Sequence, residues 1–208
     1  LALSRPDRKK NIAGLVEAFG RDKELQMLAN LAIFAGIRRD IAHMADNERE
    51  VLTELLLLMD KYDLYGKMAI PKQHDSRYEV PELYRAAARS QGVFVNPAFT
   101  EPFGLTLLEA GASGLPVVAT EDGGPRDILE NTGHGLLVDP TNCEQIAQAI
   151  KDILTDDDRW RTYSERGIER VRERYSWQRH CNDYLAAFDD LPAPGKAATP
   201  HSRGSGKR

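Results

Sequence analysis

Cysteine is scarce in this sequence: Cys143 and Cys181 are the only two in 208 residues, and neither has the spacing or the histidine partner of a metal ligand. The pair argues against a disulfide framework and against a zinc site. Apolar runs are also short, because none approaches the roughly 20 residues that a membrane-spanning helix needs. From these absences we expect a protein of the reducing cytoplasm that contacts no membrane.

Positive charge is not in excess either. The sequence has 28 Lys and Arg against 32 Asp and Glu, a net charge of −4, which argues against nucleic-acid binding by bulk charge. Any anion site must therefore be local. The first apolar run leads into a basic loop and not into a G-x-G-x-x-G turn, which argues against a dinucleotide dehydrogenase. No Asp-x-Asp pair follows a predicted strand, so we expect no obligatory metal and no cofactor.

Short apolar runs alternate with amphipathic segments along the chain. The segment 12–19 carries apolar residues at i, i+3, i+4 and i+7, a helical spacing, whereas the run 29–36 is continuously apolar, as in a strand buried on both faces. Strands that alternate with helices favour a doubly wound, mostly parallel, Rossmann-like sheet. The predicted strands are residues 1–4, 29–36, 67–71, 92–97, 115–120 and 133–140, and two final helices break around Tyr175 and Ser176.

Residues 1–191 are predicted to form one domain, whose first strand is truncated because the chain starts inside its apolar run. Residues 192–208 are rich in Pro, Gly, Ser and basic side chains and have no apolar period. Such a composition cannot bury enough apolar surface to offset chain entropy. We therefore predict that this segment is a disordered tail or linker.

The stretch 96–124, NPAFTEPFGLTLLEAGASGLPVVATEDGG, indicates a ligand site. Gly104 stands at a turn that opens a helical run, and the free N–H groups of a helix start form an anion site. The groups expected to be free are those of Leu105, Thr106 and Leu107. Glu101 falls in the preceding loop. Glu109 falls within the helix, where a carboxylate can accept two hydrogen bonds from a ribose diol, so phosphate and diol together indicate a nucleotide.

Other candidates follow other predicted strands. Arg5 and Lys10 lie in the basic loop after the first strand, and the loop 72–80 follows the third. Gly123 and Gly124 form a turn, where glycine permits positive φ values and a close backbone approach. The carboxyl ends of parallel strands lie at one edge of a sheet, where such folds bind ligands. We therefore expect these residues to gather there. The neighbouring Arg8 and Lys9 are interpreted as solvated surface charges.

The spacing Glu, seven residues, Glu, with PFGL directly after the first Glu, resembles the retaining nucleotide-sugar-dependent glycosyltransferases of the two-domain GT-B type. With LALSRPDRKKN, DKYDLYGK, YRAAARSQGVFVNPA, GLPVVAT and GGPRDI, the chain is similar, as far as about Leu191, to the donor-binding C-terminal half of the sucrose-phosphate synthases. In that family an Arg and a Lys five positions apart hold the donor diphosphate. The resemblance assigns those roles to Arg5 and Lys10.

The resemblance also implies the remaining roles. Glu101, Phe103 and Gly104 would lie at the donor sugar, and Leu105 and Thr106 at the phosphate. Glu109 would bind the ribose, and the nucleobase would lie against His74 and Val80. The implied reaction transfers glucose from UDP-glucose to fructose 6-phosphate with retention, giving sucrose 6-phosphate and UDP, with Arg5, Lys10 and Glu101 as the catalytic residues.

The half that would bind fructose 6-phosphate is absent from the sequence, so the chain alone is expected to bind nucleotide and to catalyse little or nothing. Four alternatives stay open: a sucrose synthase, another GT-B glycosyltransferase, a nucleotide-sugar epimerase on a related fold, and a non-catalytic nucleotide-binding module. Glu101 is expected to position the sugar, and a role as covalent nucleophile in a two-step displacement is the alternative.

Overall fold

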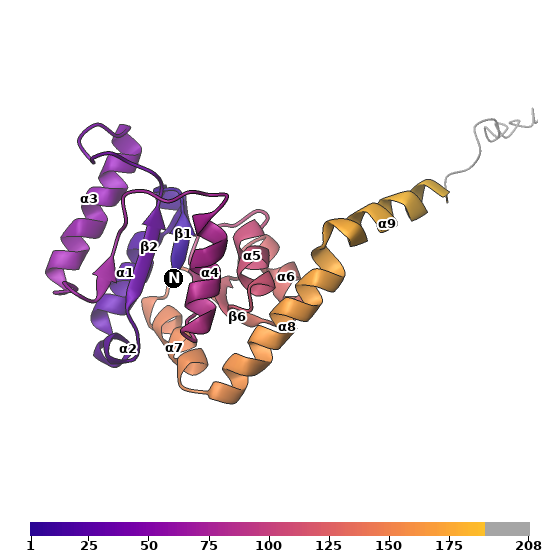
Figure 1. Cartoon of the computed structure of the whole chain (residues 1–208). Helices are drawn as coiled ribbons and strands as arrows, with labels where there is room; N and C mark the ends of the chain where they lie inside the picture. The colour runs from indigo at the N-terminus through magenta and orange to yellow at the C-terminus, as the bar shows by residue number, and fades with distance from the viewer. Residues whose placement is uncertain (190–208) are drawn as a thin grey trace, which may run out of the picture.

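A computed structural model describes residues 1–189 of the chain, so the predicted tail, residues 192–208, lies outside the described residues. Strands and helices alternate as predicted (Figure 1). The strands are β1 (Ala2–Ser4), β2 (Leu31–Ala35), β3 (Met68–Ala69), β4 (Phe94–Asn96), β5 (Val117–Thr120) and β6 (Gly135–Val138).

The strands form two three-stranded sheets, β1-β2-β3 and β4-β5-β6, in which every neighbouring pair is parallel. The two sheets meet at β1 and β4. There the Val95 N–H donates to the Leu1 carbonyl at 2.8 Å, and the Leu1 amino group donates to the Val93 carbonyl at 2.9 Å. Read across both sheets, the order is β3-β2-β1-β4-β5-β6. This order confirms the predicted doubly wound fold and places its switch point between β1 and β4, where such folds bind ligands.

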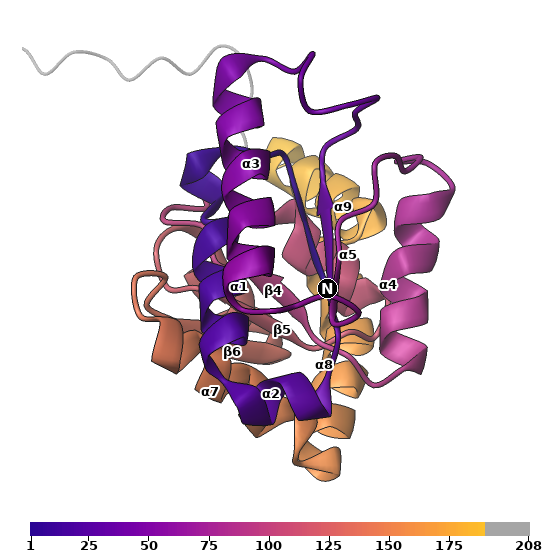
Figure 2. The ribbon, with the colours of Figure 1, turned by 90° about the vertical axis from the view of Figure 1, so that its left-hand side faces the viewer.

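Helices cover both faces of the sheet (Figures 1 and 2). Several begin at a side-chain cap, for example at Asn142, whose Oδ1 accepts the Gln145 N–H at 3.0 Å. A short helix that was not predicted, α2, begins in the same way at Asp22. The helices are η1 (Arg8–Lys10), α1 (Ile12–Arg21), α2 (Lys23–Leu28), α3 (Asp46–Lys61), α4 (Glu79–Arg89), α5 (Leu105–Ala112), α6 (Gly124–Thr132), α7 (Cys143–Leu154), α8 (Asp157–Tyr175) and α9 (Trp177–Asp189).

The core has two parts, one on each face of the sheet, and the alternation of side chains along β4 separates them. Val93 and Val95 pack in a cluster with α1, α2, α3 and α7, whereas Phe94 packs in a second cluster with α4, α5 and α6. Phe94 is fully buried. Burying one such side chain stabilises a fold by about 1.5–3 kcal/mol, so a strand apolar on both faces is held strongly in the middle of the sheet.

The last two helices break where the sequence analysis expected. Ser176 lies between α8 and α9 with an extended backbone, and its Oγ accepts the Arg179 N–H at 3.2 Å. Serine is a preferred residue at such a helix start because its oxygen satisfies an otherwise free N–H. In Figure 1, α9 continues away from the body of the sheet. No helix within residues 1–189 combines the length and the apolar character that a membrane crossing requires.

Candidate active site at the switch point

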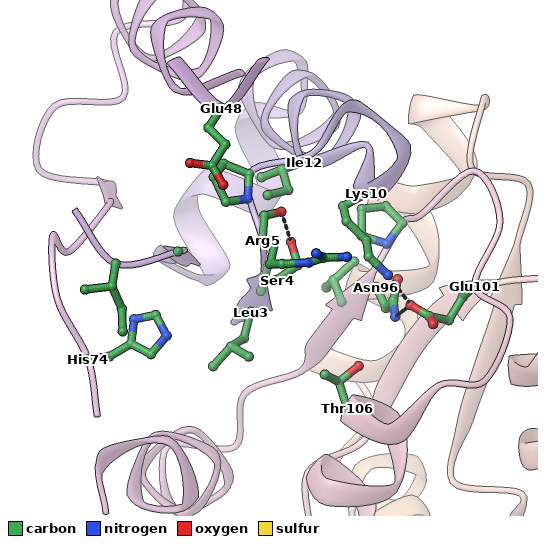
Figure 3. Close-up of a pocket in the computed structure, with 16 residues that line it drawn as sticks. Leu3, Ser4, Arg5, Lys10, Ile12, Glu48, His74, Asn96, Glu101 and Thr106 are labelled. Carbon is green, nitrogen blue, oxygen red and sulfur yellow. Dashed lines mark hydrogen bonds and ion pairs between the residues drawn. The ribbon is translucent and has the colours of Figure 1, made fainter. Parts of the chain in front are cut away.

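A cavity of about 550 Å³ opens at the carboxyl ends of β1 and β4. Its walls come from the loops after β1, β2, β3 and β4 and from the first turn of α5, so segments far apart in the sequence meet there (Figure 3). The polar and charged residues that line it are Ser4, Arg5, Lys10, Glu48, His74, Asn96, Glu101 and Thr106. The predicted convergence at one edge of the sheet therefore holds for Arg5, Lys10, His74, Glu101 and Thr106.

Lys10 and Glu101 form an ion pair in this cavity. The Lys10 Nζ lies 2.7 Å from the Glu101 Oε2, although the two residues are 91 positions apart. Their side chains are 25% and 12% exposed, so the pair is largely shielded from water. An ion pair in such surroundings is screened far less than one at the surface.

Asn11 holds the loop that carries Lys10. Its backbone has a φ of 48°, in the left-handed region that asparagine tolerates better than most residues. Its buried Nδ2 donates to the carbonyls of Pro97 at 3.0 Å and Pro140 at 2.7 Å. One amide thus joins the loops after β1, β4 and β6. The sequence analysis assigned no role to Asn11, and its partners lie 86 and 129 residues away.

Glu101 is held ionised by its neighbours. Burial raises the pKa of its carboxyl, but hydrogen bonds from Lys10 and Asn96 and the charge of Lys10 outweigh burial, so the pKa lies below its usual value. Asn96, at the end of β4, donates through Nδ2 to the Glu101 Oε2 at 3.1 Å. A carboxylate that accepts two side-chain hydrogen bonds favours its charged form. The contribution of Asn96 was not predicted.

The start of α5 has the geometry of an anion site. Gly104 precedes it with a φ of 94°, so the glycine predicted at this turn has the left-handed backbone that glycine favours. No acceptor among residues 1–189 takes the N–H groups of Leu105 and Thr106. The Leu107 N–H donates to the Gly104 carbonyl at 3.0 Å, so the prediction that it is free was wrong. Only the first two N–H groups remain for an anion.

The glycine turn after β5 supports the Glu101 loop. Gly123 forms a parallel bridge with Glu101, and the Gly124 N–H donates to the Glu101 carbonyl at 2.9 Å. Gly123 uses the freedom of glycine with a φ of 98°, whereas Gly124 is not among the residues with positive φ. Gly124 is needed for close approach instead, because a Cβ there would lie 2.3 Å from the Phe103 carbonyl oxygen.

Five predicted site residues do not line the cavity: Val80, Phe103, Gly104, Leu105 and Glu109. Val80, in the first turn of α4, points into the core, and its N–H donates to the Asp75 carbonyl at 3.0 Å. The Phe103 ring is 67% exposed. Glu109 is exposed on α5 and accepts a hydrogen bond at 3.1 Å from the Tyr84 hydroxyl, whose pKa is raised by burial and by the Glu109 charge.

His74 does line the cavity. Its Nδ1 is buried and has no hydrogen-bond partner among the described residues, and its ring lies edge-on to Phe34 at 5.7 Å between centroids. A buried nitrogen without a partner is costly, which makes it available to a ligand. Glu48, from the first turn of α3, also faces the cavity and was not predicted, because in the sequence it belongs to an ordinary charged run.

Within residues 1–189, no three His, Cys, Asp or Glu side chains are placed to hold a metal ion. The cavity instead offers Arg5, Lys10 and a helix start to an anion, next to an ionised Glu101. A doubly wound parallel sheet with such a site at its switch point defines a ligand-binding α/β domain of the GT-B kind, the fold of its structural neighbours.

The chain belongs to the group 1 glycosyl transferases, because the profile of that family matches residues 1–170. It is 50% identical over 197 residues to probable sucrose-phosphate synthase 5 of Oryza sativa subsp. japonica, and 51% identical over 185 residues to the sucrose-phosphate synthase of Zea mays. These alignments cover 93% and 89% of this chain but only 19% and 17% of the relatives. The chain thus spans less than one fifth of their length.

Solved structures give the same assignment. The sucrose-phosphate synthase of Thermosynechococcus elongatus superposes with a TM-score of 0.72 at 31% identity, over 90% of this chain and 45% of that one. Anabaena Alr3699/HepE, solved in complex with UDP, superposes with a TM-score of 0.75 at 19% identity, over 91% of this chain and 48% of that one, and shares the fold. The resemblance to the sucrose-phosphate synthases is therefore confirmed for the described domain.

Proposed function

We propose that this chain is the donor-binding half of a retaining glucosyltransferase that carries glucose from UDP-glucose to fructose 6-phosphate, releasing sucrose 6-phosphate and UDP. The observation that carries the proposal is the Lys10–Glu101 pair, 2.7 Å apart in a cavity that also holds Arg5 and the start of α5. Relatives about 50% identical over some nine tenths of the chain are sucrose-phosphate synthases, and HepE was solved with UDP and with UDP-glucose. We also propose that residues 1–191 form one domain and that the protein is located in the cytoplasm.

In this proposal the cavity stabilises the leaving diphosphate. Departure of UDP builds negative charge on the phosphate as the sugar becomes oxocarbenium-like. Lys10, Arg5 and the free N–H groups of Leu105 and Thr106 are the donors that meet this charge, and such preorganised donors usually supply the largest part of the rate enhancement. Asn11 holds the loop that carries Lys10, and Gly104 sets the backbone that presents the two N–H groups, before the ligand arrives.

In this proposal Glu101 contacts the sugar of the donor and Glu109 contacts the ribose. Glu101 is ionised and largely buried, so it supports positive charge on the sugar and orients its hydroxyls. In this proposal Glu109, which accepts a hydrogen bond from Tyr84, binds the ribose diol, and the unpartnered His74 Nδ1 is available to the nucleobase. No separate base is assigned, because in retaining enzymes of this fold the leaving phosphate oxygen takes the proton of the acceptor.

The acceptor would be bound by sequence outside this chain, which spans less than one fifth of its plant relatives. The isolated chain is therefore expected to bind UDP and UDP-glucose and to show little or no turnover. Mixing it with the N-terminal half of a sucrose-phosphate synthase, and then supplying fructose 6-phosphate or free fructose, separates this function from that of a sucrose synthase. The proposed acceptor would be contradicted if the mixture released no UDP with either acceptor. It would also be contradicted if the mixture released UDP with free fructose but not with fructose 6-phosphate.

Titration calorimetry with UDP and UDP-glucose tests donor binding directly. The matched pair of variants is Lys10→Met and Lys9→Met, since Lys9 is the adjacent lysine but its side chain is exposed and does not line the cavity. Losing a charged hydrogen bond costs about 1.5–3 kcal/mol, so Lys10→Met should weaken binding about 10- to 150-fold while Lys9→Met stays near the wild type. Glu109→Ala should also bind UDP more weakly. No binding by the wild type, or equal affinities for the two lysine variants, would refute the proposal.

A further inference from the structure

One oxygen atom of Glu101 has two donors. Its Oε2 accepts from the Lys10 Nζ at 2.7 Å and from the Asn96 Nδ2 at 3.1 Å (Figure 3). Asn96 is 8% exposed, and its Oδ1 accepts the Ala98 N–H at 3.2 Å. Because its oxygen is engaged there, the NH2 group of the amide must face Glu101. The donor is thus fixed on the strand before any ligand binds.

Ligand binding would separate Lys10 from Glu101. Under the proposed function, on which this inference rests, Lys10 turns its ammonium toward the phosphate of the ligand. The Glu101 side chain is only 12% exposed, and a largely buried carboxylate that loses its cationic partner is strongly disfavoured. The groups that then still lower the pKa of Glu101 are the Asn96 amide and a backbone hydrogen bond from Phe103. With too few donors, Glu101 would take up a proton and lose the charge that the sugar needs.

Other charged or titratable groups nearby do not replace Lys10. Arg5, Glu48 and His74 face the same cavity, but within residues 1–189 only Lys10 forms an ion pair with Glu101. On the adjacent loop Asp122 accepts from the Thr100 hydroxyl at 2.7 Å, and its carbonyl accepts the Glu101 N–H. Asn96 is therefore the side-chain donor to Glu101 that does not also have to serve a phosphate.

We propose that Asn96 is a positioning residue that keeps Glu101 ionised and in place while Lys10 exchanges it for the phosphate of the ligand. A neutral amide suits this task. A second cation at position 96 would bind the phosphate as well, whereas an amide adds a hydrogen bond and no net charge. The local backbone holds it, so the donor remains when the lysine moves.

The test measures protons taken up on binding. The wild type and Asn96→Leu are titrated calorimetrically with UDP-glucose in buffers of different ionisation enthalpy between pH 5.5 and 7.5. UDP-glucose is chosen because its phosphates do not titrate in this range. The wild type should bind with almost no proton uptake from Glu101, whereas Asn96→Leu should take up a growing fraction of a proton, approaching one, as the pH falls.

Controls isolate Glu101 from other titrating groups such as His74. The double variant Asn96→Leu/Glu101→Gln should lose the extra uptake, and Asn47→Leu, the same change at an exposed asparagine of α3, should behave as the wild type. Asn96→Ala removes the donor without adding a titratable group, so it serves if the leucine variant does not fold, and it should also take up a proton. Binding by either variant at position 96 without extra uptake would overturn this role of Asn96 alone. An absence of binding by the wild type would instead refute the proposed function.

Discussion

His134 should make the stability of the domain depend on pH. The residue is fully buried, and its Nε2 lies 3.2 Å from the Leu107 carbonyl in the first turn of α5. That carbonyl can only accept, so Nε2 carries the hydrogen, and Nδ1 lies 2.6 Å from the Thr132 Oγ1, which itself donates to the Ile128 carbonyl at 2.7 Å. Burial lowers the pKa of His134 from 6.5 to about 4, against the opposing effect of the Leu107 hydrogen bond.

The sign follows from the protonation states. Between pH 6.5 and 4 the unfolded chain binds a proton at His134 that the folded chain does not, so the free energy of unfolding must fall as the pH falls. Each unit of pKa shift corresponds to about 1.36 kcal/mol, so the loss is about 2 kcal/mol at pH 5 and about 3 kcal/mol at pH 4. The stabilisation is complete above pH 6.5.

Urea denaturation of the wild type and of His134→Gln, measured from pH 7.5 to pH 4, checks this value. The glutamine cannot be charged, so the difference between the two unfolding free energies should shrink by about 3 kcal/mol over this range. Taking the difference removes the titration of groups common to both proteins. His43→Gln, at an exposed histidine, is the control. Parallel curves for the wild type and His134→Gln would refute the reasoning.

Three further predictions concern the loops around the cavity. Lys10→Met should lower the free energy of unfolding by about 1–3 kcal/mol by leaving Glu101 without its cation, and Lys10→Met/Glu101→Gln should recover most of the loss in urea titrations. Equal losses in the single and the double variant would argue against the pair. Asn11→Ala should lower the free energy of unfolding by about 2–4 kcal/mol, measured by thermal unfolding, because the carbonyls of Pro97 and Pro140 lose their donor. A change under about 0.5 kcal/mol would show that Asn11 does not hold these loops together. Gly66→Ala should lower the free energy of unfolding by about 1–2 kcal/mol, because nothing lies within 4 Å of the added methyl group and only the positive φ opposes it. Gly124→Ala should lower it by more, because its methyl group would collide with the Phe103 carbonyl. A smaller loss of unfolding free energy for Gly124→Ala than for Gly66→Ala would show that the backbone at Phe103 shifts at little cost.

Much of the fold could be predicted because its signals are local. The continuous apolar runs form strands, which are buried throughout in β5, and the helical runs form helices, since burial on a 3.6- or 2-residue period is visible in the sequence itself. Details of the site depend on packing that the sequence does not show. The side chain of Val80 lies in the core on the buried face of α4, so the nucleobase contact expected of its main chain stays a prediction. The Leu107 N–H was expected to be free, but the tight first turn of α5 returns it to Gly104.

The sequence analysis did not identify Asn11, Asn96 or Glu48, because their positions depend on contacts that cannot be seen in the sequence. Asn11 is an ordinary loop residue in the sequence, and only the assembled sheet brings Pro97 and Pro140 to its amide. Asn96 is close to Glu101 in sequence, but amides at strand ends are common, and its direction depends on the hydrogen bond to Ala98. Glu48 belongs to a charged helix start, and the position of α3 over the β1 loop turns it toward the cavity.

The amino-acid sequence by itself determined the alternation of strands and helices, the left-handed turn at Gly104 and the basic loop after β1. Each depends on the side chains and backbone of a few neighbouring residues, so each can be read locally. The tertiary structure alone decided that β1 lies beside β4, and with it that Lys10 meets Glu101 across 91 residues. Strand order is a property of the whole core, because it depends on which arrangement lets the helices on both faces bury their apolar sides at once.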